Sequence, residues 1–344
     1  MHRPSSRFQG RALIRAGHQV LNYAYSLVTE NVLPAERVGM ARALPHSRWP
    51  GSGNDCSGDD LMKGNAADQG GLGGAPTAPH PVLKKYYESE GDRQAFVTAL
   101  FDGGARYYDW VCGMASLGSG QFYRRWVLAR SGLGGGMKLL DVATGTGLVA
   151  RAALRILREP GAVIGLDPSR GMLEQARKAF SVPLVQGTVE ALPFEDDHFD
   201  FLSMGYALRH VADLGVAFRE CRRVLKPGGR LLVLEISRPR STMGRWLLRV
   251  YFQQVLPLIT RLGTGSAQAE LLMKYFWDTI AECVPPATIL EFLRASGFVE
   301  VERRVRGGLL SEYIGLKPAR ERGERLGAGA QRMARSAGEI PRSP

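Results

Sequence analysis

Cysteine and histidine are scarce in this 344-residue sequence, and their placement excludes several classes of protein. The four cysteines are widely separated and form no paired spacing: Cys56, Cys112, Cys221 and Cys283. A disulfide framework or a zinc site is therefore not expected, and the reducing cytosol is the expected location. The six histidines also lack the spacing of metal ligands, so we expect no metal.

The sequence also has no long apolar run and no phosphate-binding lysine motif. Residues 20–28 are too few to span a bilayer, and Asn22 and Ser26 interrupt them. No Ser-His-Asp arrangement is convincing, and the most prominent glycine turn lacks the lysine that would meet a phosphate. A membrane-spanning protein and a P-loop enzyme are therefore not predicted.

The most informative feature present is a glycine turn that follows a short apolar strand. Residues 139–147 have the sequence LLDVATGTG, and Asp167 ends the next apolar run. Glycines at 145 and 147 allow a sharp turn and close approach to a ligand, and the helix that starts there offers unpaired N–H groups. The pattern predicts a nucleotide-like cofactor site with a carboxylate placed for a ribose.

Two classes of cofactor fit this pattern. A nicotinamide dinucleotide fits because residues 145–150 have the form G-x-G-x-x-A and an acid follows about twenty residues later. However, Asp141 closes the strand and three residues separate it from the first glycine, and its carboxylate would repel a pyrophosphate while suiting a cationic amino-acid group. S-adenosylmethionine has an ammonium and a sulfonium but no phosphate, so the sequence favours it.

Strand and helix patterns alternate through the middle of the chain. Strands are expected at residues 139–141, 162–167, 183–187, 199–205 and 231–236, with a helix at 171–180 and another ending at 222–226. This alternation predicts an α/β fold with a doubly wound parallel sheet, and a ligand beyond the carboxyl ends of its strands.

Several motifs follow one another in a specific order from about residue 101 to 317. They are DVATGTG, VEALPF, YALRH, RVLKPGGRLLVLEIS and a terminal pair, GFVEVE and EYIGLK. Together they resemble the class I S-adenosylmethionine-dependent methyltransferases, and more narrowly the UbiE/MenG family of ubiquinone and menaquinone C-methyltransferases. The resemblance implies a Rossmann-like, mostly parallel seven-stranded sheet with an antiparallel C-terminal strand. It also implies a methyltransferase whose cofactor is S-adenosyl-L-methionine.

The resemblance further implies a set of cofactor-binding residues on the glycine turn and the strand ends. They are Gly145, Thr146, Gly147, Asp167, Thr188, Val189 and Gly205, and we expect Asp141 to join them because its charge suits the cationic end of the cofactor. The carboxylate of Asp167 can accept hydrogen bonds from both ribose hydroxyls, and backbone groups near Thr188 can contact the adenine edge.

The substrate end departs from the family pattern, in which Leu-Arg-Asn replaces this chain's Leu208-Arg209-His210. The resemblance implies Arg209 and Tyr108 as catalytic residues, and His210 is a third candidate because of its side-chain chemistry. Arginine stays protonated, so we expect Arg209 to stabilise a developing phenolate, whereas His210 has the better pKa for proton removal. A solvent-facing His210 at a helix start is the alternative.

The expected reaction is methyl transfer to an aromatic ring carbon of a quinol precursor in ubiquinone or menaquinone biosynthesis. The changed substrate segments leave a second hypothesis open, in which the acceptor is another phenolic or polyketide-like small molecule. A hypothesis of a different class is a cofactor-binding subunit without catalysis.

The chain divides into three parts by composition. Residues 81–318 form the expected methyltransferase domain, and residues 319–344 an arginine-rich flexible tail. Residues 1–80 are expected to be a disordered extension that ends in a glycine-rich linker. Its first part has arginines at every fourth position from 3 to 15, so a transit peptide, a membrane-docking segment and an extension upstream of Met62 all stay open.

The net charge of +12 raises the question of an anionic partner. Nucleic acid is not predicted, because basic residues are not interleaved with aromatic ones as in RNA-binding proteins. Residues 243–262 mix apolar, aromatic and arginine side chains, which is typical of a lid over a substrate pocket or of a helix at a membrane surface. We therefore expect a lipophilic aromatic small molecule as substrate and peripheral membrane contact, and leave a homodimer open.

Overall fold

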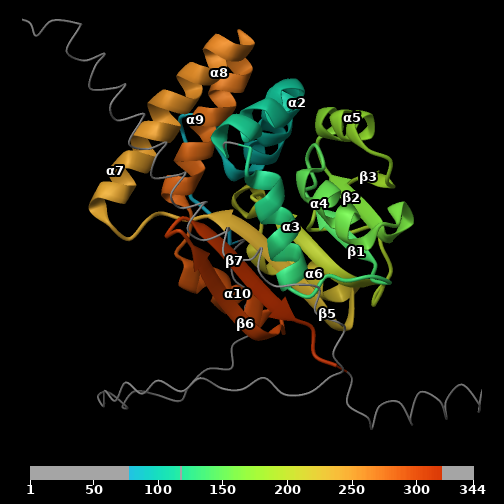
Figure 1. Ribbon diagram of the computed structural model, residues 1–344. Coiled ribbons are helices and arrows are strands. Elements are labelled where there is room, and N and C mark those ends of the chain that lie inside the picture. Colours follow the sequence, from blue (N-terminus) through green and yellow to red (C-terminus); the bar gives the residue numbers. More distant parts are fainter. Residues whose placement is uncertain (1–76, 117, 320–344) are drawn as a thin grey trace, which may run out of the picture.

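The fold is built around one twisted sheet of seven strands (Figure 1). The computed structural model describes residues 77–116 and 118–319, so the predictions made for residues 1–76 and 320–344 lie outside it. The strands are β1 (Leu139–Val142), β2 (Val163–Asp167), β3 (Leu184–Gln186), β4 (Phe199–Gly205), β5 (Leu225–Ile236), β6 (Val299–Arg306) and β7 (Leu310–Leu316).

The sheet has the order β3-β2-β1-β4-β5-β7-β6. Strands β1 to β5 pair in parallel, whereas β7 runs antiparallel between β5 and β6. The chain order reverses at β1, where the next strand, β2, lies on one side and β4 on the other. This topology confirms the predicted doubly wound, mostly parallel sheet with an antiparallel C-terminal strand, and it opens a crevice at the carboxyl ends of β1 and β4.

Nine helices surround this sheet within the described residues. They are α2 (Glu90–Ala115), α3 (Gly120–Arg130), α4 (Leu148–Leu157), α5 (Arg170–Ala179), α6 (Leu214–Val224), α7 (Thr242–Val250), α8 (Leu256–Thr264), α9 (Ala267–Glu282) and α10 (Pro286–Ala295). Helices α4, α5 and α6 each connect two parallel strands, as crossover helices must.

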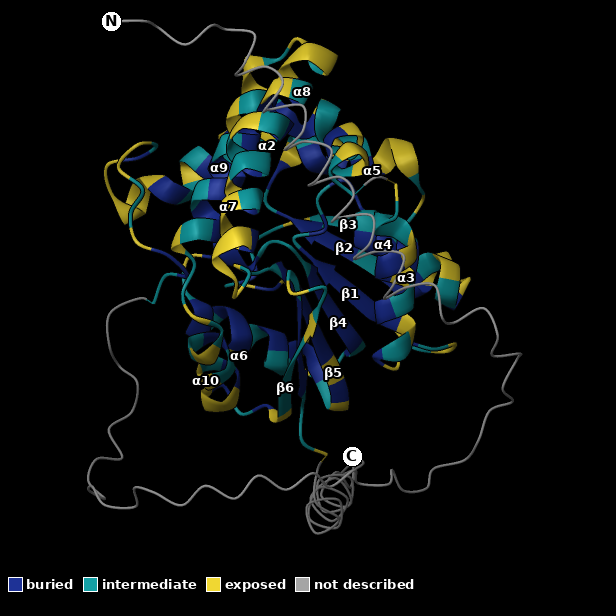
Figure 2. Ribbon diagram, turned by 60° about the vertical axis from the view of Figure 1, so that its left-hand side comes forward, coloured by how far each residue is buried: buried dark blue, intermediate teal, exposed yellow. Residues whose placement is uncertain are grey.

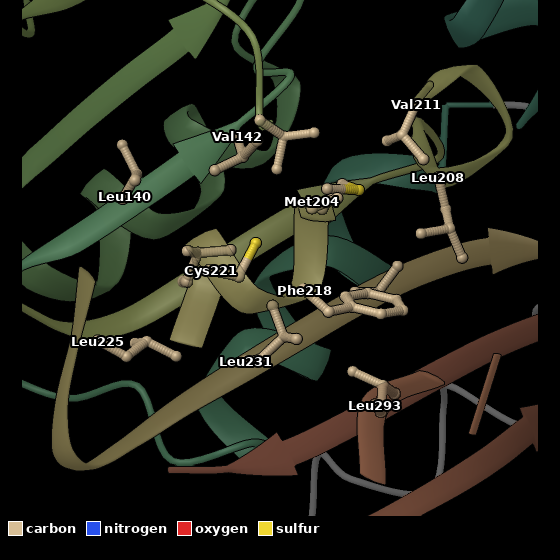
Figure 3. Packing of buried hydrophobic residues seen from close by; sticks show 14 of the residues in the cluster. Leu140, Val142, Met204, Leu208, Val211, Phe218, Cys221, Leu225, Leu231 and Leu293 are labelled. Carbon is tan, nitrogen blue, oxygen red and sulfur yellow. The ribbon is translucent and has the colours of Figure 1, made fainter. Parts of the chain in front are cut away.

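Each face of the sheet buries its own apolar cluster, because successive side chains of a strand point to opposite faces. Leu139 of β1 packs with apolar residues of α3 and α4. The next residue, Leu140, packs on the other face with residues of α6 and α10, among them Phe218 and Leu293 (Figure 3). All four residues of β1 are buried, and three of them are apolar, as expected of a strand that is covered on both faces.

A third cluster joins α2 to α7, α8 and α9 in a layer of helices beside the carboxyl end of the sheet (Figure 1). The segment 243–262, predicted as one amphipathic helix, consists of α7, a π-helical turn (Tyr251–Val255) and α8. Its buried side chains, such as Phe252 and Leu256, pack in the same cluster as Trp277 of α9. No helix in the described ranges has both the length and the apolar character needed to cross a bilayer.

Residues 77–80 belong to the fold, although the sequence placed them in the linker. The backbone N–H of Thr77 donates to the carboxylate of Asp213 at 2.9 Å, and the carbonyl of Pro79 accepts from Val284 at 2.8 Å. His80 is almost fully buried. These contacts use mostly backbone groups, so the composition of the segment gave no sign of them.

Candidate active site

A cleft opens at the carboxyl ends of β1, β2 and β4, with one side of α2 as its other wall. It encloses about 740 Å³ of space, counted with its open mouth. The predicted site residues that line it are Tyr108, Gly145, Asp167, Thr188, Val189, Gly205 and His210. The others lie behind this wall: Asp141, Thr146, Gly147 and Arg209.

The glycine turn between β1 and α4 adopts backbone angles that other residues rarely tolerate. Gly145 has φ of 57° and Gly147, which precedes α4, has φ of 82°. A Cβ on Gly147 would also lie 2.0 Å from the ring of Phe180. The turn therefore needs glycine at 147 for both conformation and space.

Asp167 ends β2 with its carboxylate in the cleft wall. One oxygen accepts from the backbone N–H of Gly145 at 2.7 Å and the other from that of Ser169 at 2.8 Å. Each oxygen keeps further acceptor capacity, as two ribose hydroxyls require. Burial raises the pKa of Asp167 to about 6, although the two N–H donors oppose this rise.

Asp141 stabilises the glycine turn from the interior of the protein through hydrogen bonds. Its carboxylate accepts from the hydroxyls of Thr144 at 2.6 Å and Ser203 at 2.7 Å, and from the backbone N–H of Ala150 at 3.1 Å. The side chain is 1% exposed, and burial raises its pKa to about 6. Since these donors hold the carboxylate behind the wall, Asp141 positions the turn, and the structure gives it no direct path to the cationic end of a ligand.

Thr146 likewise turns its side chain away from the cleft. Its hydroxyl donates to the carboxylate of Asp109 on α2, which also pairs with Arg151 of α4 at 2.5 Å. Thr146 therefore ties α2 to the glycine turn, and only its backbone is left for contact with a cofactor.

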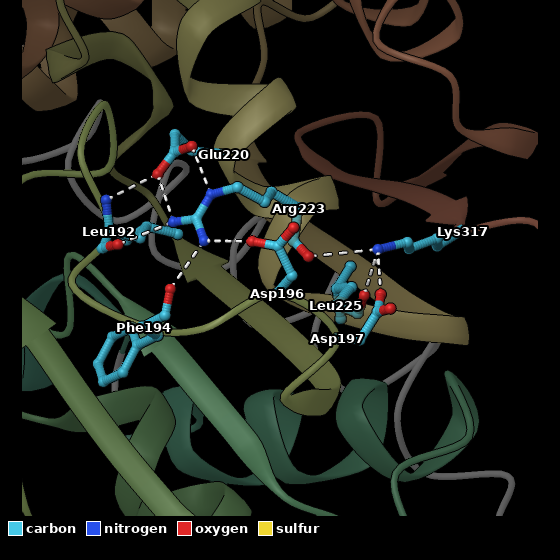
Figure 4. A network of polar contacts seen from close by, with 8 residues as sticks. All are labelled: Leu192, Phe194, Asp196, Asp197, Glu220, Arg223, Leu225 and Lys317. Carbon is cyan, nitrogen blue, oxygen red and sulfur yellow. Dashed lines mark hydrogen bonds and ion pairs between the residues drawn. The ribbon is translucent and has the colours of Figure 1, made fainter. Parts of the chain in front are cut away.

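Thr188 and Val189 form part of the cleft wall. The loop that follows them is fixed by a network of hydrogen bonds and ion pairs around Arg223 (Figure 4). Arg223 of α6 donates to the carbonyls of Leu192 at 2.9 Å and Phe194 at 2.7 Å. It also pairs with Glu220 at 2.7 Å. These bonds fix the loop between β3 and β4, and with it the wall of the cleft.

Arg209 lies in the 3₁₀ turn Leu208–His210 and is fully buried. Its guanidinium pairs with Glu235 of β5 at 2.9 Å and donates to the carbonyls of Phe276 and Tyr206, each at 3.2 Å. A further bond reaches the hydroxyl of Thr279 at 3.2 Å. Arg209 therefore joins the β4 end to β5 and α9, and the structure does not place its charge where a substrate could meet it.

His210, by contrast, lines the cleft with both ring nitrogens buried and without a hydrogen-bond partner among the described residues. Its ring stacks on Tyr275 with centroids 5.6 Å apart and meets the edge of Phe101 at 5.2 Å. Burial lowers the pKa of His210 well below its usual value, and the nearby charge of Arg209 acts in the same direction. The imidazole is therefore neutral near pH 7 and can accept a proton.

Tyr108 faces the same end of the cleft as His210. Its ring centroid lies 6.2 Å from that of Phe101 and 6.4 Å from that of Phe276. Burial raises the pKa of the Tyr108 hydroxyl well above its usual value, so this phenol stays protonated and can donate a hydrogen bond.

Of the part of the cleft formed by α2, sequence reasoning named Tyr108 as a site residue and missed the others. Gln94 and Thr98 line the cleft one helical turn apart, followed on the same face by Phe101 and Tyr108. It also missed Glu235, the partner of Arg209. The signal for Glu235 was a single acid within the apolar run LLVLEIS.

In the described residues, no group of three His, Cys, Asp or Glu side chains is arranged to hold a metal ion. The cleft instead combines a ribose-type carboxylate, a glycine turn without a phosphate-binding lysine, and an aromatic end. With the sheet order described above, these features define a class I S-adenosylmethionine-dependent methyltransferase.

The chain belongs to the ubiE/COQ5 methyltransferase family, whose model matches residues 88–317. It is 33% identical over 241 residues to the ubiquinone/menaquinone biosynthesis C-methyltransferase UbiE of Shewanella sp. strain ANA-3, covering 67% of this chain and 95% of that protein. The UbiE protein of Shewanella oneidensis is equally similar, with the same identity and the same shares. These matches confirm the family resemblance and the cofactor, S-adenosyl-L-methionine.

Solved structures of methyltransferases are also similar, at lower identity. A SAM-dependent methyltransferase from Aquifex aeolicus is 18% identical with a TM-score of 0.44, over 58% of this chain and 92% of that chain. A phosphoethanolamine-type N-methyltransferase from Haemonchus contortus, solved with S-adenosylhomocysteine, is 18% identical with a TM-score of 0.47, over 67% of this chain and 59% of that chain.

Proposed function

We propose that this protein methylates a ring carbon of a quinol precursor in ubiquinone or menaquinone biosynthesis. The names of the similar Shewanella proteins support this acceptor. The aromatic end of the cleft also supports it, because Phe101 and Tyr108 line the cleft and an aromatic substrate can pack against their rings.

The proposal rests on the unpaired ring nitrogens of His210. Its imidazole lies in the cleft wall, and both buried ring nitrogens lack a hydrogen-bond partner in the described part of the chain. A quinol hydroxyl can supply that hydrogen bond. A hydroxyl that loses its proton makes the neighbouring ring carbon nucleophilic. We assign proton removal to a ring nitrogen of His210, in the neutral state that burial favours.

Tyr108 and Arg209 have supporting roles in this proposal. The Tyr108 hydroxyl, which stays protonated, donates to the oxygen on which negative charge develops. Arg209 positions His210 by fixing the 3₁₀ turn that carries it, and its charge holds the imidazole neutral. This replaces the direct stabilisation of a phenolate that the sequence suggested for Arg209.

The cofactor end of the cleft fits S-adenosyl-L-methionine, which supplies an electrophilic methyl group when bound. Asp167 would hold the ribose, and the wall at Thr188 and Val189 would contact the adenine. Gly145 leaves the backbone open to the ligand and Gly205 also lines the cleft, while Asp141, Thr146 and Gly147 shape the turn behind it.

We also propose that the substrate is lipophilic and reaches the cleft from a membrane to which the protein attaches peripherally. The cytosolic location and the absence of a nucleic-acid partner stay predictions. A homodimer is left open, as it was from the sequence. A second acceptor class, another phenolic small molecule, stays in view because His210 stands where the family pattern has asparagine.

The test is complementation of a host that lacks its quinone methyltransferase, with its quinones measured by mass spectrometry. Wild-type protein should restore the methylated quinone, and the His210→Phe variant should not, although both bind S-adenosylhomocysteine. Failure of a soluble, cofactor-binding wild-type protein to restore the quinone would reject the quinol acceptor.

A further inference from the structure

We propose that one face of the helical layer docks on an anionic lipid bilayer. This docking face consists of exposed apolar residues of α7, α8 and the end of α2, with two arginines among them. The apolar members are Trp110, Met114, Met243, Trp246, Leu258 and Leu262, and the arginines are Arg245 and Arg249. The inference deepens the proposed function, in which a lipophilic acceptor comes from a membrane.

The first observation is the exposure of large apolar side chains on α7 and α8. Met243 is 65% exposed, Trp246 52%, Leu258 55% and Leu262 78%. Leu258 and Leu262 are four residues apart and share one side of α8, and Trp246 is exposed on α7 in the same continuous helical stretch. Figure 2 shows exposed surface along both helices. Clusters of this kind on a protein surface usually mark a contact site.

The end of α2 continues this face. The ring of Trp110 lies against Gly263 of α8, where an added Cβ would be 2.3 Å from it. The hydroxyl of Tyr251 donates to the carbonyl of Ala115 at 3.4 Å. Trp110 and Met114, each 41% exposed, therefore adjoin the apolar residues of α8.

The positive charge of this region indicates an anionic partner. Residues 237–269 contain no acidic residue but five arginines, at positions 238, 240, 245, 249 and 261. Arg261 pairs with Glu270, whereas Arg245 and Arg249 form no ion pair with any described residue. A second copy of this face would meet its own positive charge and be repelled, while anionic lipid headgroups complement it.

The combination matches the chemistry of an interfacial helix. Tryptophan and leucine side chains can enter the boundary between headgroups and acyl chains, while the arginines extend to the phosphates. Helix α2 carries both sites, because Tyr108 lines the cleft and Trp110, two residues later, lies on the docking face. Docking would therefore hold the cleft beside the bilayer that contains the acceptor.

The experiment is cosedimentation of the full chain with vesicles of phosphatidylcholine plus phosphatidylglycerol, and with vesicles of phosphatidylcholine alone. We expect binding to the anionic vesicles that weakens in high salt. The double variant Arg245→Glu/Arg249→Glu should weaken it by about tenfold or more. The double variant Trp246→Ala/Leu262→Ala should also weaken it.

The matched control is Arg177→Glu/Lys178→Glu on α5, which makes the same change in net charge at two exposed positions. This control should bind the vesicles nearly as wild type does. An equal loss in the control and in the arginine variant, or no binding of wild type to anionic vesicles, overturns the proposal. Self-association that Trp246→Ala/Leu262→Ala abolishes, without vesicle binding, would assign the face to a second copy and also overturns it. Binding is measured without turnover, so this result is independent of the identity of the acceptor.

Discussion

The guanidinium of Arg209 and the carboxylate of Glu235 form an ion pair of 2.9 Å in which neither side chain reaches solvent. Tyr206, which follows β4, and Phe276 and Thr279 of α9 accept its remaining hydrogen bonds. An arginine with all these partners has few donors left for a substrate. The pair is therefore a structural support of the site.

Arg209→Ala should destabilise the protein by about 3–5 kcal/mol, because it leaves the buried charge of Glu235 without a partner. Chemical unfolding of the two proteins measures this difference. The double variant Arg209→Met/Glu235→Leu should recover much of the stability, since it removes both charges. Wild-type stability of Arg209→Ala, together with loss of turnover, would contradict this role and return Arg209 to direct contact with substrate.

Gly147→Ala should destabilise the fold by more than about 1 kcal/mol and weaken cofactor binding, because residue 147 has a positive φ and no room for a Cβ. Thermal unfolding and titration with S-adenosylhomocysteine measure the two effects. Gly161→Ala is the control, as nothing lies within 4 Å of its Cβ position. Equal effects of the two changes would show that the turn does not require glycine at 147.

The sequence predicted the central sheet well because its strands are short, buried and regularly spaced. It placed the fifth strand at 231–236, whereas β5 begins at Leu225. The motif Lys226-Pro227-Gly228-Gly229 suggested a turn there. The structure instead bends the strand at this point, with a register shift against β4 and φ of 80° at Gly228.

The cofactor end of the site was more predictable than the substrate end. Asp167 and the glycine turn lie within one stretch of chain, so local pattern sufficed to bring them together. Arg209 meets Glu235 and α9, which lie far along the chain, and a motif match cannot show that such partners occupy the guanidinium. Gln94 and Thr98 of α2 were missed as cleft residues because only the packing of α2 against distant elements reveals which side faces the cleft.

Cofactor affinity should decrease as the pH falls through about 6. Burial raises the pKa of Asp167 to about 6 in the free protein, and ribose hydroxyls that donate to the carboxylate would lower it. Binding below this pH must therefore expel a proton, whereas above it the carboxylate is already charged. Calorimetry with S-adenosylhomocysteine, in buffers of different ionisation enthalpy, measures both the affinity and the proton released.

Asp167→Asn is the control for this pH dependence. It should weaken binding by about 1–3 kcal/mol at pH 8. The amide nitrogen is a hydrogen-bond donor, and it would face another donor, the N–H of either Gly145 or Ser169. Its affinity should then vary little between pH 5 and pH 7. An unchanged pH dependence in Asp167→Asn would assign the titration to another group, with Asp141 the first candidate.

His210→Phe should lower kcat by about 10²- to 10⁴-fold while leaving the affinity for S-adenosylhomocysteine near that of wild type. Phenylalanine keeps the packing against Tyr275 and Phe101 but removes both ring nitrogens, so a loss of turnover reports the proton acceptor and not the shape of the cleft. The pH profile adds a second readout. Because the pKa of His210 lies well below its usual value, wild-type kcat should show no acid limb near pH 6.5, and any such limb due to His210 should appear at lower pH.

His210→Asn restores the residue of the family pattern and separates two explanations. If His210→Asn is as active as wild type, hydrogen bonding by an amide suffices, and proton removal belongs to a water molecule or to the substrate's own ionisation. If both variants lose turnover alike, the imidazole itself takes the proton, and this chain has replaced its family's asparagine with a base.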